Sequence, residues 1–126
     1  MKSLTLLFFI LSSFISCESP EENLEKDREL LQLKLEEIKT YIATENCTQD
    51  AQCEYIAYGN KACGGPSGYL VFPSDLNLEE LEELIADYTQ AEREFNAKYN
   101  QISDCAIVLP PENIKCVDGK CEIISP

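Results

Sequence analysis

The chain has 126 residues, with 10 basic and 23 acidic side chains and a formal net charge of −13. A chain of this length is expected to form a single domain. Because it contains no histidine, His-based acid–base catalysis, His-activated nucleophiles and His-ligated metal sites are excluded. The strong acidity argues against a nucleic-acid partner, since phosphate binding requires a basic surface.

The N-terminal segment has the pattern of an export signal. Residues 4–15 are almost entirely apolar, and about a dozen apolar residues are too few to span a bilayer as a helix but typical of a signal peptide. The stretch ends in Phe14-Ile15-Ser16-Cys17, which resembles the lipobox of bacterial lipoproteins. The resemblance implies removal of residues 1–16 as a signal peptide and lipidation of Cys17, whose acyl chains anchor the protein in a membrane.

Residues 17–22 are expected to form the lipidated N-terminus and a short tether. In the lipoprotein family, inner-membrane proteins usually carry Asp directly after the lipidated Cys, whereas this chain has Glu18. The resemblance therefore implies a cell-envelope protein at the outer membrane, with the periplasmic and surface faces both left open. Because an acidic chain is repelled by anionic lipid, the lipid alone is expected to hold it there. The alternative is an ordinary secretory signal peptide cut nearby, which leaves Cys17 as a free thiol.

Two amphipathic helices are predicted within residues 23–126, the expected cysteine-rich domain. In residues 21–45, apolar side chains recur at helical spacing and acids crowd the first turn, where the helix dipole favours them. Residues 78–99 carry a similar apolar stripe, preceded by Asn77 as N-cap with Glu80 three residues on, as in a capping box. The charged residues of both helices are expected to form solvent-exposed faces.

The remaining predicted elements are short β-strands. Cys53–Tyr58 and residues 104–109 are each predicted as a strand, the second ended by two prolines. Residues 113–124 are predicted as a hairpin around Asp118-Gly119, a typical type I′ turn. A two-residue turn pairs Val117 with Lys120, Cys116 with Cys121, Lys115 with Glu122 and Ile114 with Ile123. The order predicts an α+β fold, with two amphipathic helices packed on a small antiparallel sheet that includes the C-terminal hairpin.

Six cysteines remain besides Cys17, and an even number in an exported chain is typical of a disulfide framework. Zinc sites favour closely spaced cysteine pairs, and no Cys-x-x-Cys occurs, so no metal site is expected. The two hairpin cysteines are expected to staple other segments, although a bond between them also fits their spacing. Disulfides, with the pairing left open, are predicted at Cys47, Cys53, Cys63, Cys105, Cys116 and Cys121.

The segment from Tyr58 to Tyr69 is a candidate binding loop that holds four of the five glycines. Its simplest interpretation is a stapled connection between a strand and the second helix. The functional interpretation is a rigid loop that presents one exposed basic side chain, Lys61, close to Cys63, because a preorganised loop binds at low entropic cost. The candidate binding residues are Lys61, Ala62, Gly64, Gly65, Pro66 and Tyr69.

Four elements together resemble a group of small cysteine-rich bacterial lipoproteins and periplasmic proteins. They are the segment Cys47–Cys53, the Ala-Cys-Gly-Gly-Pro-x-x-Tyr loop at 62–69, the Ser-Asp-Cys segment at 103–105 and the hairpin Cys116–Cys121. The resemblance covers about residues 47–121. It implies a shared fold and brings no activity with it.

The expected function is that of a non-catalytic envelope lipoprotein that serves as a binding module. Its expected partners are the membrane, through the lipid on Cys17, and an envelope or extracellular protein. No catalytic residue and no cofactor beyond that lipid are expected. One alternative is a protease inhibitor that inserts Lys61, in the loop pinned by Cys63, into an acidic specificity pocket. A second is a carboxylate-dependent hydrolase, which requires two acids about 5–10 Å apart in a cleft.

Overall fold

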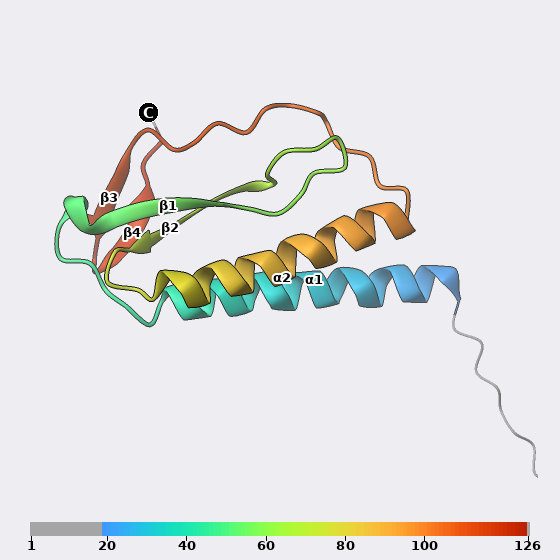
Figure 1. The fold of residues 1–126 in the computed structure, drawn as a ribbon, viewed down its shortest axis with the longest axis horizontal. Coiled ribbons are helices and arrows are strands. Elements are labelled where there is room, and N and C mark those ends of the chain that lie inside the picture. Colours follow the sequence, from blue (N-terminus) through green and yellow to red (C-terminus); the bar gives the residue numbers. More distant parts are fainter. Residues whose placement is uncertain (1–18, 126) are drawn as a thin grey trace, which may run out of the picture.

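The computed structural model describes residues 19–125, so the predicted signal peptide (1–16) and Cys17 lie outside the described residues. The described part has the predicted α+β fold, with two helices, two small antiparallel sheets and three disulfides. In Figure 1 the two helices lie side by side along one face, a first hairpin runs above them, and a second hairpin sits at one end.

The two α-helices agree closely with the predicted ranges. Helix α1 spans Pro20–Ile42 and helix α2 spans Leu78–Lys98. Helix α1 begins inside the predicted tether, because the Ser19 hydroxyl caps it and proline suits a first helical turn. As predicted, Asn77 caps α2, its side-chain oxygen accepting from two backbone N–H groups of the first turn. Among the described residues, neither helix is long and apolar enough to cross a membrane.

The start of α1 and the end of α2 are joined through the carboxylate of Asp27. It accepts hydrogen bonds from the Lys98 ammonium and the Tyr99 hydroxyl, each at 2.7 Å. These bonds, first that from Lys98, hold the pKa of Asp27 below its usual range. The pair is therefore charged at neutral pH and links the two helices at this end.

The four strands form two separate two-stranded sheets rather than one. Strand β1 (Cys53–Tyr58) pairs antiparallel with β2 (Gly68–Pro73), and β3 (Ile114–Val117) pairs antiparallel with β4 (Lys120–Ile123). All four residue pairs of the β3–β4 hairpin are those predicted. Both residues of its turn have positive φ, as a type I′ turn requires.

Two predictions about strands are wrong. The predicted connection after Tyr58 becomes strand β2 from Gly68 onward, since its apolar residues pair with β1. The predicted strand at 104–109 does not form, and residues 101–111 have no regular secondary structure. Cys105 has a φ of 50°, which breaks an extended run. The segment is instead joined by the Cys63–Cys105 disulfide to the loop between β1 and β2.

The core lies between the helices and the β1–β2 hairpin. Its two most deeply buried side chains are Ile38 of α1 and Leu81 of α2. The surrounding buried residues are Phe72, Leu76, Ile85 and Tyr88. A core of this size stabilises a domain only modestly, so covalent cross-links matter for its stability.

Three disulfides connect segments far apart in the chain. The bonds are Cys47–Cys116, Cys53–Cys121 and Cys63–Cys105. Each hairpin cysteine thus bonds to the region at or just before β1, as expected from its position, and not to its cross-strand neighbour. Further contacts dock the hairpin: the Cys116 N–H donates to the Asp50 carboxylate at 2.8 Å, in the short 3₁₀ helix Asp50–Gln52.

Candidate functional site

The binding loop predicted within Tyr58–Tyr69 is observed as residues 59–67, between β1 and β2. One half-buried carboxylate fastens it to helix α2. Glu92 accepts hydrogen bonds from the backbone N–H of Asn60, from the Ser67 hydroxyl (2.7 Å) and from the Tyr88 hydroxyl (3.2 Å). Burial, followed by the Glu92 charge, raises the pKa of Tyr88, so this hydroxyl remains a donor. The bonds from Asn60 and Ser67 hold the loop against the helix, whereas the bond from Tyr88 lies within α2 and orients the Glu92 carboxylate.

The first residue of this loop must be glycine. Gly59 has a φ of +79°, and its N–H donates to the Thr89 hydroxyl at 3.0 Å. A Cβ at this position would lie 2.5 Å from the Glu92 carboxylate and from the Ser67 hydroxyl. A larger residue would therefore displace the groups that hold the loop.

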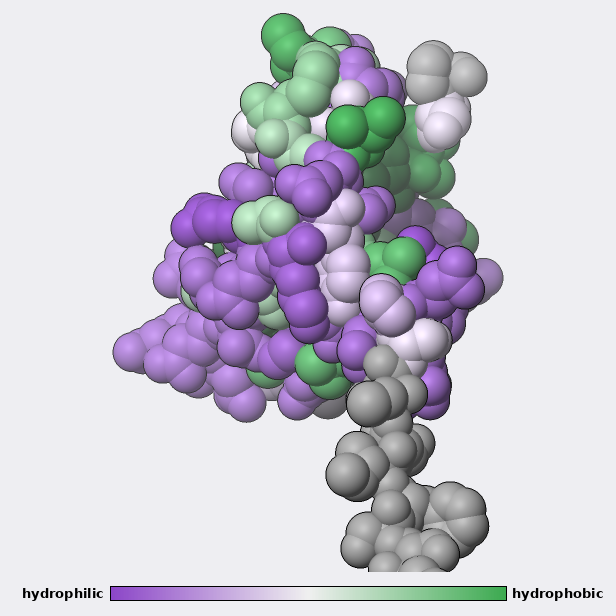
Figure 2. Space-filling model, turned by 90° about the vertical axis from the view of Figure 1, so that its right-hand side faces the viewer, coloured by the Kyte–Doolittle hydropathy of each residue, from purple (hydrophilic) through white to green (hydrophobic). Residues whose placement is uncertain are grey.

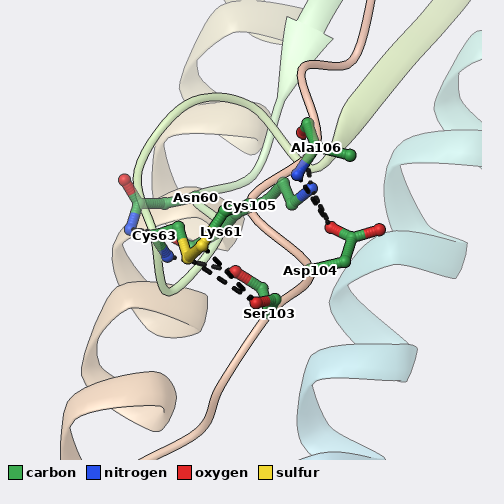
Figure 3. The surroundings of a disulfide bond; sticks show 7 residues. All are labelled: Asn60, Lys61, Cys63, Ser103, Asp104, Cys105 and Ala106. Carbon is green, nitrogen blue, oxygen red and sulfur yellow. Dashed lines mark hydrogen bonds and ion pairs between the residues drawn. A yellow bond between two sulfur atoms is a disulfide. The ribbon is translucent and has the colours of Figure 1, made fainter.

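Lys61 is not the exposed side chain expected from the sequence. Its ammonium donates to the Asp104 carboxylate and, at 2.8 Å, to the Ala106 carbonyl, and only 13% of the side chain is exposed (Figure 3). The bond from Lys61, followed by one from the Ala106 N–H, holds the pKa of Asp104 below its usual range. The ion pair is therefore present at neutral pH and is lost only as the pH falls through that lowered pKa.

A disulfide joins the same loop to the same segment. Cys63 bonds to Cys105, and the Cys63 N–H donates to the Ser103 hydroxyl at 3.1 Å (Figure 3). Covalent, ionic and hydrogen-bonded links thus hold residues 103–106 against the loop. They position the chain that follows, which continues toward β3 on the side of the molecule away from the helices (Figure 1).

The other predicted binding residues do not gather into one site. Ala62, Gly64 and Gly65 lie exposed at the loop tip, which closes through the Gly64 N–H bonded to the carbonyl of residue 61 at 2.8 Å. Pro66 is half-buried, and Tyr69 is half-buried in β2. The tip is a tight turn, so the loop serves here to hold another segment in place.

The strongest candidate surface is residues 106–109, which the sequence reasoning did not single out. Ile107 is 87% exposed and Leu109 is 74% exposed, with Val108 half-buried between them. No hydrogen bond engages the backbone of residues 107–109 within the described chain. Figure 2 shows hydrophobic residues gathered at the top of the molecule, above a mostly hydrophilic face. The sequence signal for this surface is four apolar residues before two prolines. The same pattern also predicts a strand, so it does not by itself indicate an exposed surface.

Three sulfur atoms cluster where the C-terminal hairpin docks. Those of Cys47, Cys53 and Cys121 lie within 4.8 Å of one another. All three belong to disulfides, and a bonded sulfur lacks the thiolate charge that binds zinc. The cluster is therefore interpreted as two adjacent cross-links.

Comparison of the chain with protein-family models, with curated proteins and with solved structures finds no match. Its function is therefore inferred from its own geometry. That geometry is a rigidly held loop that positions an exposed apolar segment.

Proposed function

We propose that this protein is a lipid-anchored protein of the cell envelope that binds another protein and catalyses no reaction. The observation that carries the proposal is segment 106–109, in which Ile107 and Leu109 are largely exposed to solvent. Exposed apolar surface costs about 25 cal/mol per Å² relative to burial, and a contiguous exposed patch is typical of an interaction site. Because the links at residues 103–106 fix where the segment begins, its conformational entropy before binding is already reduced.

The proposed membrane anchor is a lipid on Cys17, outside the described residues. Helix α1 begins a few residues later, at Pro20, and its start lies at the end of the molecule opposite the β3–β4 hairpin (Figure 1). Two or more acyl chains hold a protein firmly in a bilayer, and Glu18 favours the outer membrane. The domain then extends away from the lipid along its helices.

Replacement of the proposed lipidation site is expected to abolish fatty-acid labelling. In cells fed a tagged fatty acid, the Cys17→Ser variant should carry no label and should keep the mass of residues 1–16. The control variant Glu18→Gln should be labelled and cleaved like the original protein. An unlabelled original protein cut near residue 16 would instead indicate an ordinary secretory signal.

The proposed binding surface is tested by photo-crosslinking in the producing cells. A photoreactive residue at position 107 should give a covalent adduct with an envelope or extracellular protein, because this position is 87% exposed. The same residue at Thr40, exposed on helix α1, serves as the control and should give no such adduct. Absence of an adduct from both 107 and 109 would contradict the proposal.

No observation favours the two alternative functions, a protease inhibitor that inserts Lys61 and a carboxylate-dependent hydrolase. The Lys61 ammonium is already paired with Asp104, so inserting it into a protease pocket would first break that pair. A hydrolase needs a carboxylic acid with a raised pKa. Within residues 19–125, the carboxyls with a shifted pKa are those of Asp27 and Asp104, and a paired lysine lowers the pKa of each.

A further inference from the structure

We propose that the protein bound by segment 106–109 is a serine endopeptidase with an apolar specificity pocket, which Ile107 enters as a substrate side chain does. This inference rests on the proposed function, because it names the partner of the same surface. The inserted side chain, Ile107, follows Cys105, whereas Lys61 precedes Cys63, the other cysteine of the same disulfide.

The segment offers the groups by which an endopeptidase binds its substrate. Such enzymes hold an extended strand, pairing with its backbone and receiving side chains in pockets. Residues 107–109 offer backbone groups without partners in the described chain, and Ile107 and Leu109 project into solvent. Pro110 and Pro111 supply no N–H, so the pairing segment is short. A short segment fits an enzyme cleft better than the longer edge of a partner's sheet.

The peptide bond after Ile107 is the one best presented for attack. Ile107 is more exposed than Leu109, and Val108 is half-buried. The bond after Leu109 leads into Pro110, whose nitrogen carries no hydrogen and whose ring restricts the backbone. An aliphatic residue at the attacked position requires an apolar pocket in the enzyme.

The links before Ile107 hold the segment ready for binding. Cys105 is bonded to Cys63, and the Ala106 carbonyl accepts from Lys61 at 2.8 Å. These residues therefore lose their conformational entropy when the chain folds, and not when the partner binds. Preorganisation of this kind raises affinity without new contacts.

The disulfides also account for inhibition in place of digestion. The enzyme's serine attacks the Ile107 carbonyl, its proton passes through the enzyme's base to the Val108 nitrogen, and the peptide bond is replaced by an ester. Residues 108–125 stay attached to the domain through Cys116 and Cys121. The Val108 amine therefore remains beside the ester at a high effective concentration. Its attack on the ester re-forms the peptide bond and returns the proton to the serine.

The test is inhibition of three purified serine endopeptidases by the oxidised full-length protein in detergent micelles. Pancreatic elastase and subtilisin accept apolar side chains, whereas trypsin requires Lys or Arg. The original protein is expected to inhibit at least one of the first two, but not trypsin. Ile107→Lys should weaken that inhibition by about 100-fold and produce inhibition of trypsin, because the residue in the pocket dominates binding.

A matched control is Ile102→Lys, the same change at a side chain that is 95% exposed but lies outside segment 106–109. It should leave every inhibition constant unchanged. Lack of inhibition by the original protein, or equal behaviour of Ile107→Lys and Ile102→Lys, would overturn the inference. If position 107 or 109 still crosslinks to a protein that is not a peptidase, the proposed binding function survives. If neither position gives an adduct, both proposals fail.

Discussion

Removal of both disulfides of the C-terminal hairpin is expected to cost more stability than the two single removals added together. Cys47–Cys116 and Cys53–Cys121 span 69 and 68 residues, and together they close one long loop and one ring of about a dozen residues. Removing either bond first opens only the ring and lowers the free energy of unfolding by about 3 kcal/mol. Removing the remaining bond then opens the long loop and lowers it by about 4 kcal/mol more. Since domains are stable by about 5–15 kcal/mol, a loss of about 7 kcal/mol would remove about half of that stability or more.

Urea unfolding of three cysteine-to-alanine variants measures this coupling. The two single-bond variants should each lose about 3 kcal/mol and the variant lacking both bonds about 7 kcal/mol. The third bond, Cys63–Cys105, lies inside the long loop but outside the small ring, so its removal should add to either single loss. Equal costs for the first and second hairpin bonds would show that the two do not share a loop in the unfolded chain.

Glu92→Ala is expected to destabilise the domain by about 3 kcal/mol and to free the loop that positions segment 106–109. The change removes one carboxylate that accepts three hydrogen bonds, one of them from the buried Tyr88. Bonds to a charged group contribute about 1.5–3 kcal/mol each in favourable cases, and water entering at the half-buried positions recovers part of that. Thermal unfolding and hydrogen exchange at the Asn60 amide measure the two effects.

The control for Glu92 is Glu94→Ala, two residues further along α2. Glu94 is exposed and accepts one bond, from Gln90, so its removal should change the free energy of unfolding by less than about 0.5 kcal/mol. In Glu92→Ala the Asn60 amide should exchange as fast as an unprotected amide, and in Glu94→Ala it should stay protected. Continued protection in Glu92→Ala would refute the assignment of Glu92 as the loop's anchor.

The elements predicted correctly from the sequence are those whose signals are local. Both helices carry an apolar stripe and their own caps, Ser19 and Asn77. The C-terminal hairpin follows from a two-residue turn that sets its register. Strand β2 was missed because β1, the strand with which it pairs, lies beyond the glycine-rich loop. The segment before Pro110 was predicted as a strand, but it has no strand partner in the described chain.

The candidate site depends on contacts between residues distant in sequence, and no local pattern predicts them. Lys61 and Asp104 are 43 residues apart, and their approach requires the Cys63–Cys105 bond, which is one of several pairings that the sequence allows. Once that bond is known, the position of Lys61 beside residues 104–106 follows directly. The Cys63–Cys105 bond therefore accounts both for the burial of Lys61, which was expected to be exposed, and for the position of the exposed Ile107.

The disulfide pattern also constrains how this protein is made. In a chain exported N-terminus first, as we propose for this one, Cys47, Cys53 and Cys63 reach the oxidising compartment before any of their bonding partners, which all lie at 105–121. Any bond formed early among these three is therefore non-native and must be exchanged before the hairpin docks. Accumulation of correctly bonded protein should accordingly depend on a disulfide isomerase in that compartment, even where an oxidant is abundant.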